Sequence, residues 1–402
     1  MADEEWVDHR DDALPPLWVG TERTGNRTPE CLGRLYQAGP NGALRDAIVK
    51  VIEGALEMVC LCSFLLSDER IHRALLAVAG RGVRVYVLTA SREQLERLPK
   101  DEERSRDRIQ EHQRRLDELA GKVLVRCSNQ FHAKFVLADP GAVWASGILS
   151  TANLNPALLT NAELGVTMGA DDVGAAFAFF CKAFWSHAVN ELRQPGELAT
   201  CQGRAFPSPA PHPRVIWTLP ESTGLGEQVL GMLENATSSV TVAVYGLDTR
   251  HRAFRMLEDR AKAGLEVTVL LPVRTKVGQA AIELAKAGAT VVGVDRLHAK
   301  AIVADDQAVV MTANLETHGL DQGCELGVVL NVDETIELLD LLERWEASAT
   351  WRLVAKATVG QVLGPVMDPG SGETGDVVEE ANGHRGRLRW AHRTKAKKKA
   401  KR

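Results

Sequence analysis

Apolar and polar positions along the chain predict helices and strands in alternation, and the order of these elements occurs twice. The elements are defined by apolar residues at helical spacing, short buried apolar runs, and glycines that follow helical segments. In the first copy the order is helix, strand, helix, strand, strand, over residues 44–56, 58–66, 68–82, 83–90 and 122–127. In the second copy the same order covers residues 226–239, 240–247, 250–264, 265–273 and 289–294. The pattern indicates a tandem duplication.

Strands that alternate with helices of this length indicate parallel strands covered by helices. A repeat of about 160 residues is the size of a domain, so the pattern predicts two lobes and not a solenoid. We therefore expect an α/β protein with two tandem lobes. Each lobe should be a mixed, mostly parallel sheet flanked by helices.

Composition marks the limits of these units, because a stretch rich in Pro and Gly separates the two copies. The predicted units are an N-terminal extension at 1–40, lobe 1 at 41–193, a linker at 194–213, lobe 2 at 214–350, and a C-terminal extension at 351–402. The first copy also carries a longer segment at residues 91–121, whose mixed charges predict a solvated helix.

The overall composition is that of an ordinary globular protein, with 45% hydrophobic and 25% charged residues. The sequence contains no run of about 18 apolar residues, and its acidic N-terminus has no apolar signal core. Seven cysteines lie at irregular positions without the spacing of metal ligands. These features predict a reduced, cytoplasmic protein without a membrane-spanning helix.

Charge is distributed unevenly along the chain. Residues 383–402 contain ten Lys or Arg and no acid, which leaves 38 basic against 53 acidic residues in the rest. The acidic, Gly-rich residues 370–383 before this tail resemble a flexible linker. The tail is a candidate contact for a polyanion or, alternatively, a solubilising disordered segment. Its candidate contact residues are Lys395, Lys397, Lys398, Lys399, Lys401 and Arg402.

The duplication includes a motif with catalytic residue types. FHAKFVLAD at residues 131–139 returns as LHAKAIVAD at residues 297–305. Both copies contain His-x-Lys-x4-Asp, followed by an asparagine and then a glutamate at similar spacing. The residues are His132, Lys134, Asp139, Asn153 and Glu163 in the first copy, and His298, Lys300, Asp305, Asn314 and Glu325 in the second. Two matches in register indicate chemistry and not coincidence.

These motifs resemble those of the phospholipase D superfamily, over both lobes. The resemblance implies two lobes related by a pseudo-twofold axis, with both motifs in one site. The sequence departs from the family pattern where Ser150-Thr151 and Met311-Thr312 replace the usual Gly-Ser. Threonine keeps the hydroxyl, but the loss of glycine restricts the approach of the backbone to phosphate.

The resemblance also implies a role for each residue. His132 would attack phosphorus and form a phosphohistidine, and His298 would protonate the leaving oxygen. Lysines, asparagines and threonines would stabilise the phosphoryl oxygens, and each glutamate would orient the histidine of the other lobe. The implied phosphate-binding residues are Lys134, Lys300, Asn153, Asn314, Thr151 and Thr312, the orienting acids Glu163 and Glu325, and the structural acids Asp139 and Asp305. No metal or other cofactor is implied.

The substrate is a separate question, because the superfamily includes nucleases, lipases and phosphatidyl transferases. The basic tail and the predicted absence of a membrane segment favour a metal-independent nuclease acting on DNA or RNA. Two alternatives stay open, a phospholipase D or phosphatidyl transferase that docks on phospholipid, and a catalytically silent nucleic-acid-binding subunit. Because an intracellular nuclease needs restraint, a helicase or another ATPase is an expected partner, as in prokaryotic defence or repair assemblies.

Overall fold

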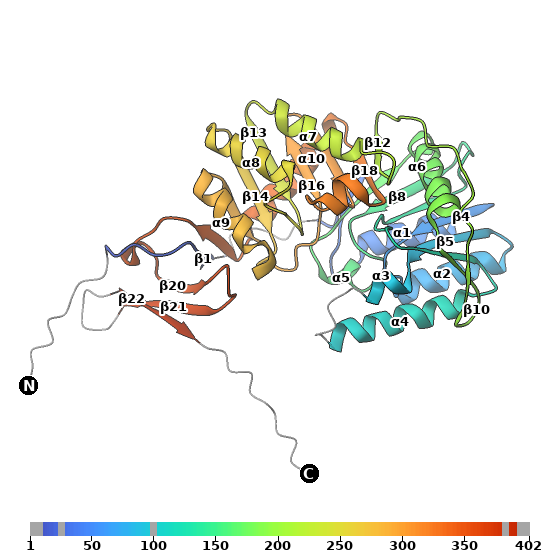
Figure 1. Ribbon diagram of the computed structural model, residues 1–402, viewed down its shortest axis with the longest axis horizontal. Helices are drawn as coiled ribbons and strands as arrows, with labels where there is room; N and C mark the ends of the chain where they lie inside the picture. The colour runs from blue at the N-terminus through green and yellow to red at the C-terminus, as the bar shows by residue number, and fades with distance from the viewer. Residues whose placement is uncertain (1–10, 23–28, 97–102, 380–385, 392–402) are drawn as a thin grey trace, which may run out of the picture.

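The computed structural model describes residues 11–22, 29–96, 103–379 and 386–391. Two bodies of sheet and helix lie side by side, and a smaller group of strands near the C-terminus projects beyond the second (Figure 1). The first body contains a ten-stranded sheet and the second a twelve-stranded sheet. The α/β class and the two duplicated lobes are thereby confirmed.

The two sheets share one strand order at their centres. Lobe 1 has the order β6-β5-β4-β7-β8-β9 and lobe 2 the order β15-β14-β13-β16-β17-β18. The lobe 1 strands are β4 (Met58–Cys62), β5 (Arg84–Ala90), β6 (Leu124–Ser128), β7 (Phe135–Ala138), β8 (Ser146–Ser150) and β9 (Leu164–Met168). Those of lobe 2 are β13 (Ser239–Ala243), β14 (Glu266–Leu271), β15 (Thr290–Gly293), β16 (Ala301–Ala304), β17 (Gln307–Met311) and β18 (Glu325–Val329). The matching order is the structural form of the sequence repeat.

Parallel pairing is limited to β4, β5 and β6 in lobe 1, and to β13, β14 and β15 in lobe 2. The strands that carry the motifs, β7 and β16, pair antiparallel with β4 and β13. The parallel part of each sheet is therefore smaller than the sequence suggested. The short turns from β7 to β8 and from β16 to β17 account for the antiparallel pairing of these strands, because only antiparallel neighbours can be joined by a short turn.

Both sheets extend beyond the lobe boundaries expected from composition. The ten-stranded sheet also contains β2 (Cys31–Leu32), β3 (Leu35–Gln37), β10 (Asn190–Gln194) and β11 (Glu197–Thr200). The twelve-stranded sheet adds β1 (Leu17–Gly20), β12 (Val215–Thr218), β19 (Trp351–Val354), β20 (Gly364–Met367), β21 (Thr374–Glu379) and β22 (Gly386–Ala391). The N-terminal extension thus supplies strands to both sheets, and part of the expected linker is strand β11.

The prediction of a flexible linker over residues 370–383 was wrong for residues Thr374–Glu379, which form strand β21. Val377 in this strand is buried against Leu17, Val359, Val362 and Val366. Burial of these apolar side chains offsets the entropy lost on ordering an acidic, Gly-rich segment. Residues 380–385 lie outside the described residues, and so does the tail from residue 392 onward.

Helices cover the sheets. They are α1 (Ala43–Glu53), α2 (Glu69–Gly80), α3 (Arg92–Glu96), α4 (Glu103–Leu119), α5 (Ala157–Thr160) and α6 (Ala170–Lys182) in lobe 1, and α7 (Gly224–Asn235), α8 (Arg252–Lys262), α9 (Gly278–Ala287) and α10 (Val332–Ala347) in lobe 2. The charge-rich segment at 91–121 contains helix α4, as expected, although its His112 is fully buried.

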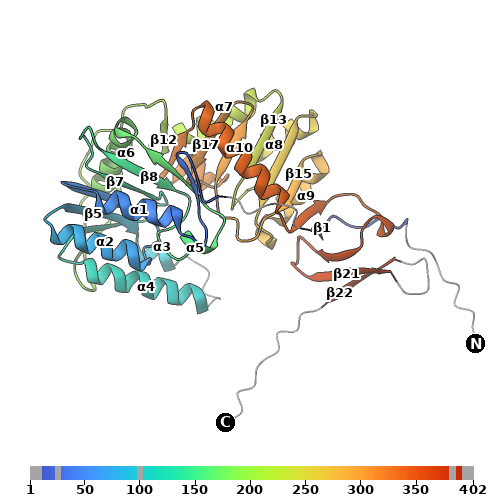
Figure 2. The same ribbon diagram turned by 180° about the vertical axis from the view of Figure 1, so that it is seen from behind.

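The lobes share one apolar core. A single cluster of buried side chains includes Phe135 and Phe179 of lobe 1 together with Val328 and Leu341 of lobe 2. Helix α6 packs on β7, β8 and β9 and also reaches β12, while α10 packs on β16 and β17 and reaches β3 (Figure 2). Because this contact is a packed apolar core, the lobes are held in one relative position.

The aspartates of the two motifs hold equivalent turns, at the strand ends away from the histidines. Asp139 and Asp305 both have φ of 51° in the left-handed region. The Asp305 carboxylate accepts hydrogen bonds from the backbone N–H groups of Thr237, Ser238 and Ser239 at 2.8–3.0 Å. The Asp139 carboxylate accepts three equivalent bonds from residues 56–58. These contacts suit the structural role expected for both residues.

We expect Asp305→Ala to lower the free energy of unfolding by roughly 2–3 kcal/mol, because backbone donors lose a charged acceptor. Hydrogen bonds from Ser239 and Thr237 lower the pKa of Asp305 to about 2. Since the folded-state pKa is depressed, this stabilisation is present above about pH 4 and is lost as pH falls toward 2. Urea unfolding measures the free energy of unfolding of the variant and of wild type at pH 7 and at pH 3. The difference between the two proteins should be smaller at pH 3. Asp306 is the exposed neighbour, and Asp306→Ala should change the free energy of unfolding little. If both variants lower it equally, the structural role of Asp305 is refuted.

Candidate active site

The two histidines lie where the lobes meet, each just before its motif strand. The preceding residues bridge to the opposite lobe, Phe131 to Cys324 and Leu297 to Ala162. The His132 N–H donates to the Cys324 carbonyl at 3.1 Å, and the His298 N–H donates to the Ala162 carbonyl at 3.0 Å. The backbone of each lobe thus fixes the histidine of the other.

Each imidazole faces a buried glutamate from the opposite lobe. His132 Nδ1 lies 2.7 Å from Glu325 Oε1, and His298 Nδ1 lies 2.7 Å from Glu163 Oε1. Burial alone would raise the pKa of each glutamate, but the facing histidine and nearby lysines outweigh it and lower the pKa. An ionised carboxylate can only accept a hydrogen bond, so each Nδ1 carries the proton and Nε2 is left with a lone pair.

The threonines have a different position from the one expected. Thr151 and Thr312 are fully buried, and their hydroxyls donate to Glu163 and Glu325. The same hydroxyl oxygens accept the N–H groups of Leu164 and Leu326 at 2.8 and 3.0 Å. Both hydroxyls are thus committed to the glutamates, which favours an orienting role over the phosphate-binding support that the resemblance implied.

Both motif lysines are fully buried. Lys134 donates to the His132 carbonyl, and Lys300 donates to the His298 carbonyl. Lys300 Nζ also lies 3.1 and 3.3 Å from the two ring nitrogens of His298. Burial lowers the pKa of Lys134 to about 7 and that of Lys300 to about 8, which reflects the cost of a cation removed from water. An anion bound here would raise the pKa of both lysines and so favour their charged form.

The histidines and lysines of both lobes act on one another electrostatically. Removal from bulk water lowers the pKa of His132 to about 4, and Lys300 of the other lobe adds to the lowering. The pKa of His298 is lowered by the same cause, and here Lys134 of the other lobe contributes. The reciprocal influence indicates a single site made by both lobes. About a fifth of each histidine side chain stays accessible, so a substrate can reach both rings.

The two asparagines differ in their contacts. The Asn153 side-chain oxygen is buried and has no hydrogen-bond partner among the described residues. The Asn314 side-chain oxygen accepts the Gly246 N–H at 3.1 Å, and its amide nitrogen donates to Glu316 at 3.3 Å. Asn153 therefore has an unpaired oxygen, whereas both polar groups of the Asn314 side chain have partners.

Sequence reasoning missed three residues beside the histidines. The Phe64 ring lies 5.7 Å from the His132 ring, edge to face, and the Tyr245 ring lies 4.4 Å from the His298 ring. The two aromatic residues lie at equivalent positions, two residues after strands β4 and β13. Arg274 stacks on Tyr245 with its guanidinium carbon 3.7 Å from the ring centroid. An alignment of the two copies beyond the motif would have revealed the aromatic pair.

The remaining predicted features lie outside the site or outside the described part of the chain. The basic tail residues 395–402 are not described. Among the described residues, no group of His, Cys, Asp and Glu side chains is arranged to hold a metal ion. No helix in the same part of the chain is long and apolar enough to cross a bilayer.

A family model described as "Cardiolipin synthase, PLD-like domain" matches residues 48–181 and 229–345, which are the two halves of the duplication. The chain belongs to this phospholipase D-like family. The match covers both motifs, so it confirms the resemblance seen in the sequence. A comparison with curated protein sequences gives no match.

Two solved structures share the phospholipase D-like fold of this chain. Phosphatidylserine synthase from Haemophilus influenzae Rd KW20 is 10% identical, with a TM-score of 0.57, and the match covers 85% of this chain and 90% of that one. Polyphosphate kinase from Porphyromonas gingivalis is 16% identical, with a TM-score of 0.52, over 77% of this chain and 50% of that one. At these identities the likeness establishes the fold alone.

Proposed function

We propose that the protein is a metal-independent nuclease that hydrolyses phosphodiester bonds of DNA or RNA through a phosphohistidine. The observation that carries this proposal is the reciprocal pairing of His132 with Glu325 and of His298 with Glu163. Each pair provides an imidazole with a defined tautomer, and the two lysines provide positive charge for the phosphoryl oxygens.

In the first step, Nε2 of neutral His132 attacks phosphorus and forms a P–N bond. The leaving oxygen takes a proton from Nε2 of protonated His298 as the P–O bond breaks. The negative charge of a phosphate bound between the rings raises the pKa of His298 and favours the protonated form that this step requires. Lys134 and Lys300 offset the charge on the phosphoryl oxygens, with Asn153 and Asn314 as neutral donors.

In the second step, neutral His298 accepts a proton from water, and the water oxygen attacks phosphorus from the side opposite His132. The P–N bond breaks and returns the electron pair to His132 Nε2. The Nδ1 proton stays between His132 and Glu325 in both steps, so the glutamate orients the ring without taking its proton.

An exposed apolar turn in lobe 1 lies away from the site, and its position supports a nucleic-acid substrate over a membrane lipid. Val143 and Trp144 are exposed in the turn that follows strand β7. His132 precedes the same strand, so this turn lies at the opposite end of β7 from the site. An enzyme that docks on a bilayer needs its apolar contacts on the face that holds its site. The basic tail can bind a phosphate backbone, and it can also bind anionic lipid, so it is compatible with both substrates.

Phosphatidyl transfer or phospholipid hydrolysis is the second candidate. It is supported by the description of the matching family, which is that of cardiolipin synthase, and by the fold shared with a phosphatidylserine synthase. The same histidines and lysines serve a lipid phosphodiester equally well. A helicase or ATPase partner remains a prediction from the sequence.

The two candidates differ in a direct assay. Wild-type protein and His132→Ala are incubated in excess EDTA with labelled single- and double-stranded DNA, RNA, and phosphatidylcholine vesicles. We expect wild type to cleave nucleic acid and the variant to leave it intact. Choline release with intact nucleic acid would support the lipid candidate. Inactivity on every substrate, with salt-sensitive DNA binding that survives His132→Ala, would indicate a silent binding subunit.

A further inference from the structure

We infer that Arg274 binds the phosphate group next to the scissile one, on the His298 side of the site, and so determines in which direction a strand is bound. This inference rests on the proposed nuclease function and assigns a residue outside both motifs.

Arg274 is held one aromatic ring away from His298. It follows strand β14, and its Nη2 donates to the Tyr245 carbonyl at 2.8 Å. Its guanidinium carbon lies 3.7 Å from the centroid of the Tyr245 ring, and the His298 ring lies 4.4 Å from the same Tyr245 ring. Lys300 Nζ lies 5.5 Å from the same ring centroid. Tyr245 therefore connects the guanidinium with the catalytic histidine and lysine.

Arg274 also lacks a counterion. No carboxylate among the described residues forms an ion pair with it, and its Nε is buried without a hydrogen-bond partner. Burial lowers the pKa of Arg274, and Tyr245 and Glu316 only partly compensate. By contrast, the half-buried Arg214 pairs with Glu334 and Asp172. Arg274 is half-buried like Arg214 but has no carboxylate among the described residues to balance its charge, and a partly desolvated cation without a counterion carries a free-energy cost that a bound anion reduces. Because guanidinium groups bind phosphate through paired N–H donors, phosphate is the anion that fits.

The pseudo-twofold relation fails at this position. Phe64 takes the place of Tyr245 in lobe 1, and Arg92 takes the place of Arg274. Arg92 is exposed and lines a separate pocket with Leu95 and His112. The motif residues alone would accept a phosphodiester in either direction, because the two lobes present the same groups. A second phosphate site on one side only makes the two directions unequal.

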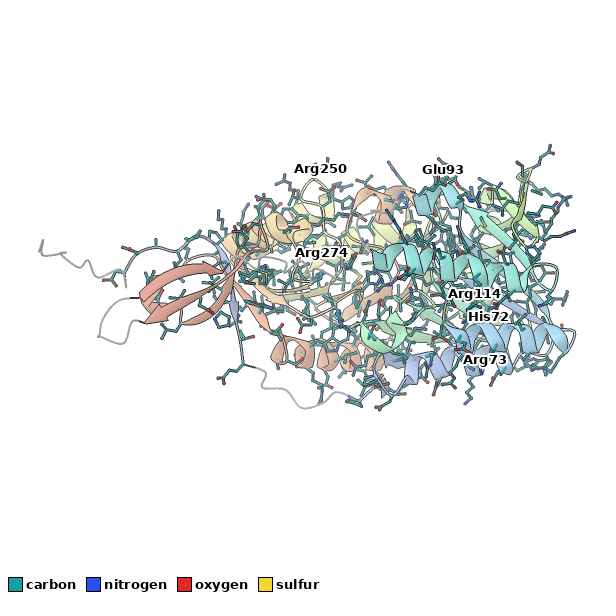
Figure 3. All side chains as sticks on the ribbon, turned by 90° about the horizontal axis from the view of Figure 1, so that it is seen from below. His72, Arg73, Glu93, Arg114, Arg250 and Arg274 are labelled. Atoms are coloured by element: carbon teal, nitrogen blue, oxygen red, sulfur yellow. The ribbon has the colours of Figure 1, made fainter. Side chains whose placement is uncertain are left out.

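Figure 3 labels Arg274 within lobe 2 and Arg250 at the outer edge of the same lobe. Arg250 is largely exposed and paired with Asp248, so its charge is already balanced. Arg255 gives a closer match for a control. Its guanidinium lies 5.8 Å from the centroid of the Phe254 ring, and it pairs with Glu258 on helix α8.

The test compares Arg274→Gln, Arg274→Lys and the control Arg255→Gln on three dinucleotides. Thymidylyl-thymidine has one phosphate, and its 5′- and 3′-phosphorylated forms have a second phosphate on one side or the other. We expect wild type to favour one phosphorylated form about 10- to 100-fold in kcat/KM, as for one charge-assisted phosphate contact. Arg274→Gln should lose this preference, and its kcat/KM should fall far less on thymidylyl-thymidine than on the phosphorylated form that wild type favours. Arg274→Lys should keep part of the preference, and Arg255→Gln all of it.

Two results would overturn the inference while leaving the nuclease intact. Wild type that cleaves an oligonucleotide but treats the three dinucleotides alike would show that no second phosphate is bound. Equal loss on all three in Arg274→Gln, with an unchanged thermal unfolding midpoint, would assign Arg274 to the reaction itself. Wild type that leaves the oligonucleotide intact would instead overturn the proposed function and this inference together.

Discussion

His132→Ala is expected to lower kcat on a nucleic-acid substrate by about 10,000-fold or more, as for removal of a covalent nucleophile. Alanine removes the atom that forms the P–N bond, and the neighbouring His298 cannot take its place. His298 faces Glu163 and Lys300, and its backbone N–H is bonded to Ala162. Steady-state cleavage of a labelled oligonucleotide measures the loss. His187→Ala, which removes a histidine paired with Glu221, serves as the control and should retain activity.

The leaving group then separates the two histidine roles. A p-nitrophenyl diester releases p-nitrophenolate, which leaves without being protonated. The general acid therefore has little to contribute to the first step with this substrate. His298→Ala should therefore accumulate a phosphohistidine on His132 with this substrate, detectable by mass spectrometry of peptides. His132→Ala should release no p-nitrophenol. If His132→Ala releases p-nitrophenol and accumulates a phosphohistidine on His298, while His298→Ala does neither, the roles of the two histidines are reversed.

Glu325→Gln is expected to lower kcat by roughly 1,000-fold, although it changes one oxygen to nitrogen. The carboxylate accepts the His132 Nδ1 proton at 2.7 Å and so keeps Nε2 free to attack. The glutamine amide can donate to Nδ1 instead, which would place the proton on Nε2 and remove the nucleophile. Thr312, which donates to the other carboxylate oxygen, would favour this flip by holding the amide oxygen.

The pH profile distinguishes this role from simple loss of folded protein. Burial lowers the pKa of His132 to about 4, and the Glu325 charge opposes that lowering. An attacking His132 must be neutral, so activity falls as pH drops through its pKa. Removing the Glu325 charge lowers the pKa further and should move the acid limb of kcat/KM to lower pH.

Glu334→Gln provides the matched control for Glu325→Gln. Glu334 is also buried, and its partners Arg214 and Arg34 lie away from the histidines. Its substitution should lower the unfolding midpoint and leave kcat near wild type. If both variants lose stability alike and keep kcat, the glutamate has a structural role only.

The sequence by itself determined the duplication and the identity of the motif residues. Hydrophobic periodicity is a local property, so the strands before each motif could be read from short windows. His132 and Lys134 lie two residues apart, and the same spacing brings His298 and Lys300 together, so their proximity needs only a local backbone. The fold class followed because alternating strands and helices have few stable packings.

Only the tertiary structure decided how these residues meet. His132 and Glu325 are 193 positions apart, and their contact depends on the apolar core that joins the lobes. The same packing buries Thr151 and Thr312 against the glutamates, where the family resemblance implied phosphate donors. It orders strand β21 through Val377, against the acidic composition around it. It also leaves Arg274 without a counterion beside Tyr245. Partners and burial are set by surfaces that meet across the lobes, and no single window of sequence contains both surfaces.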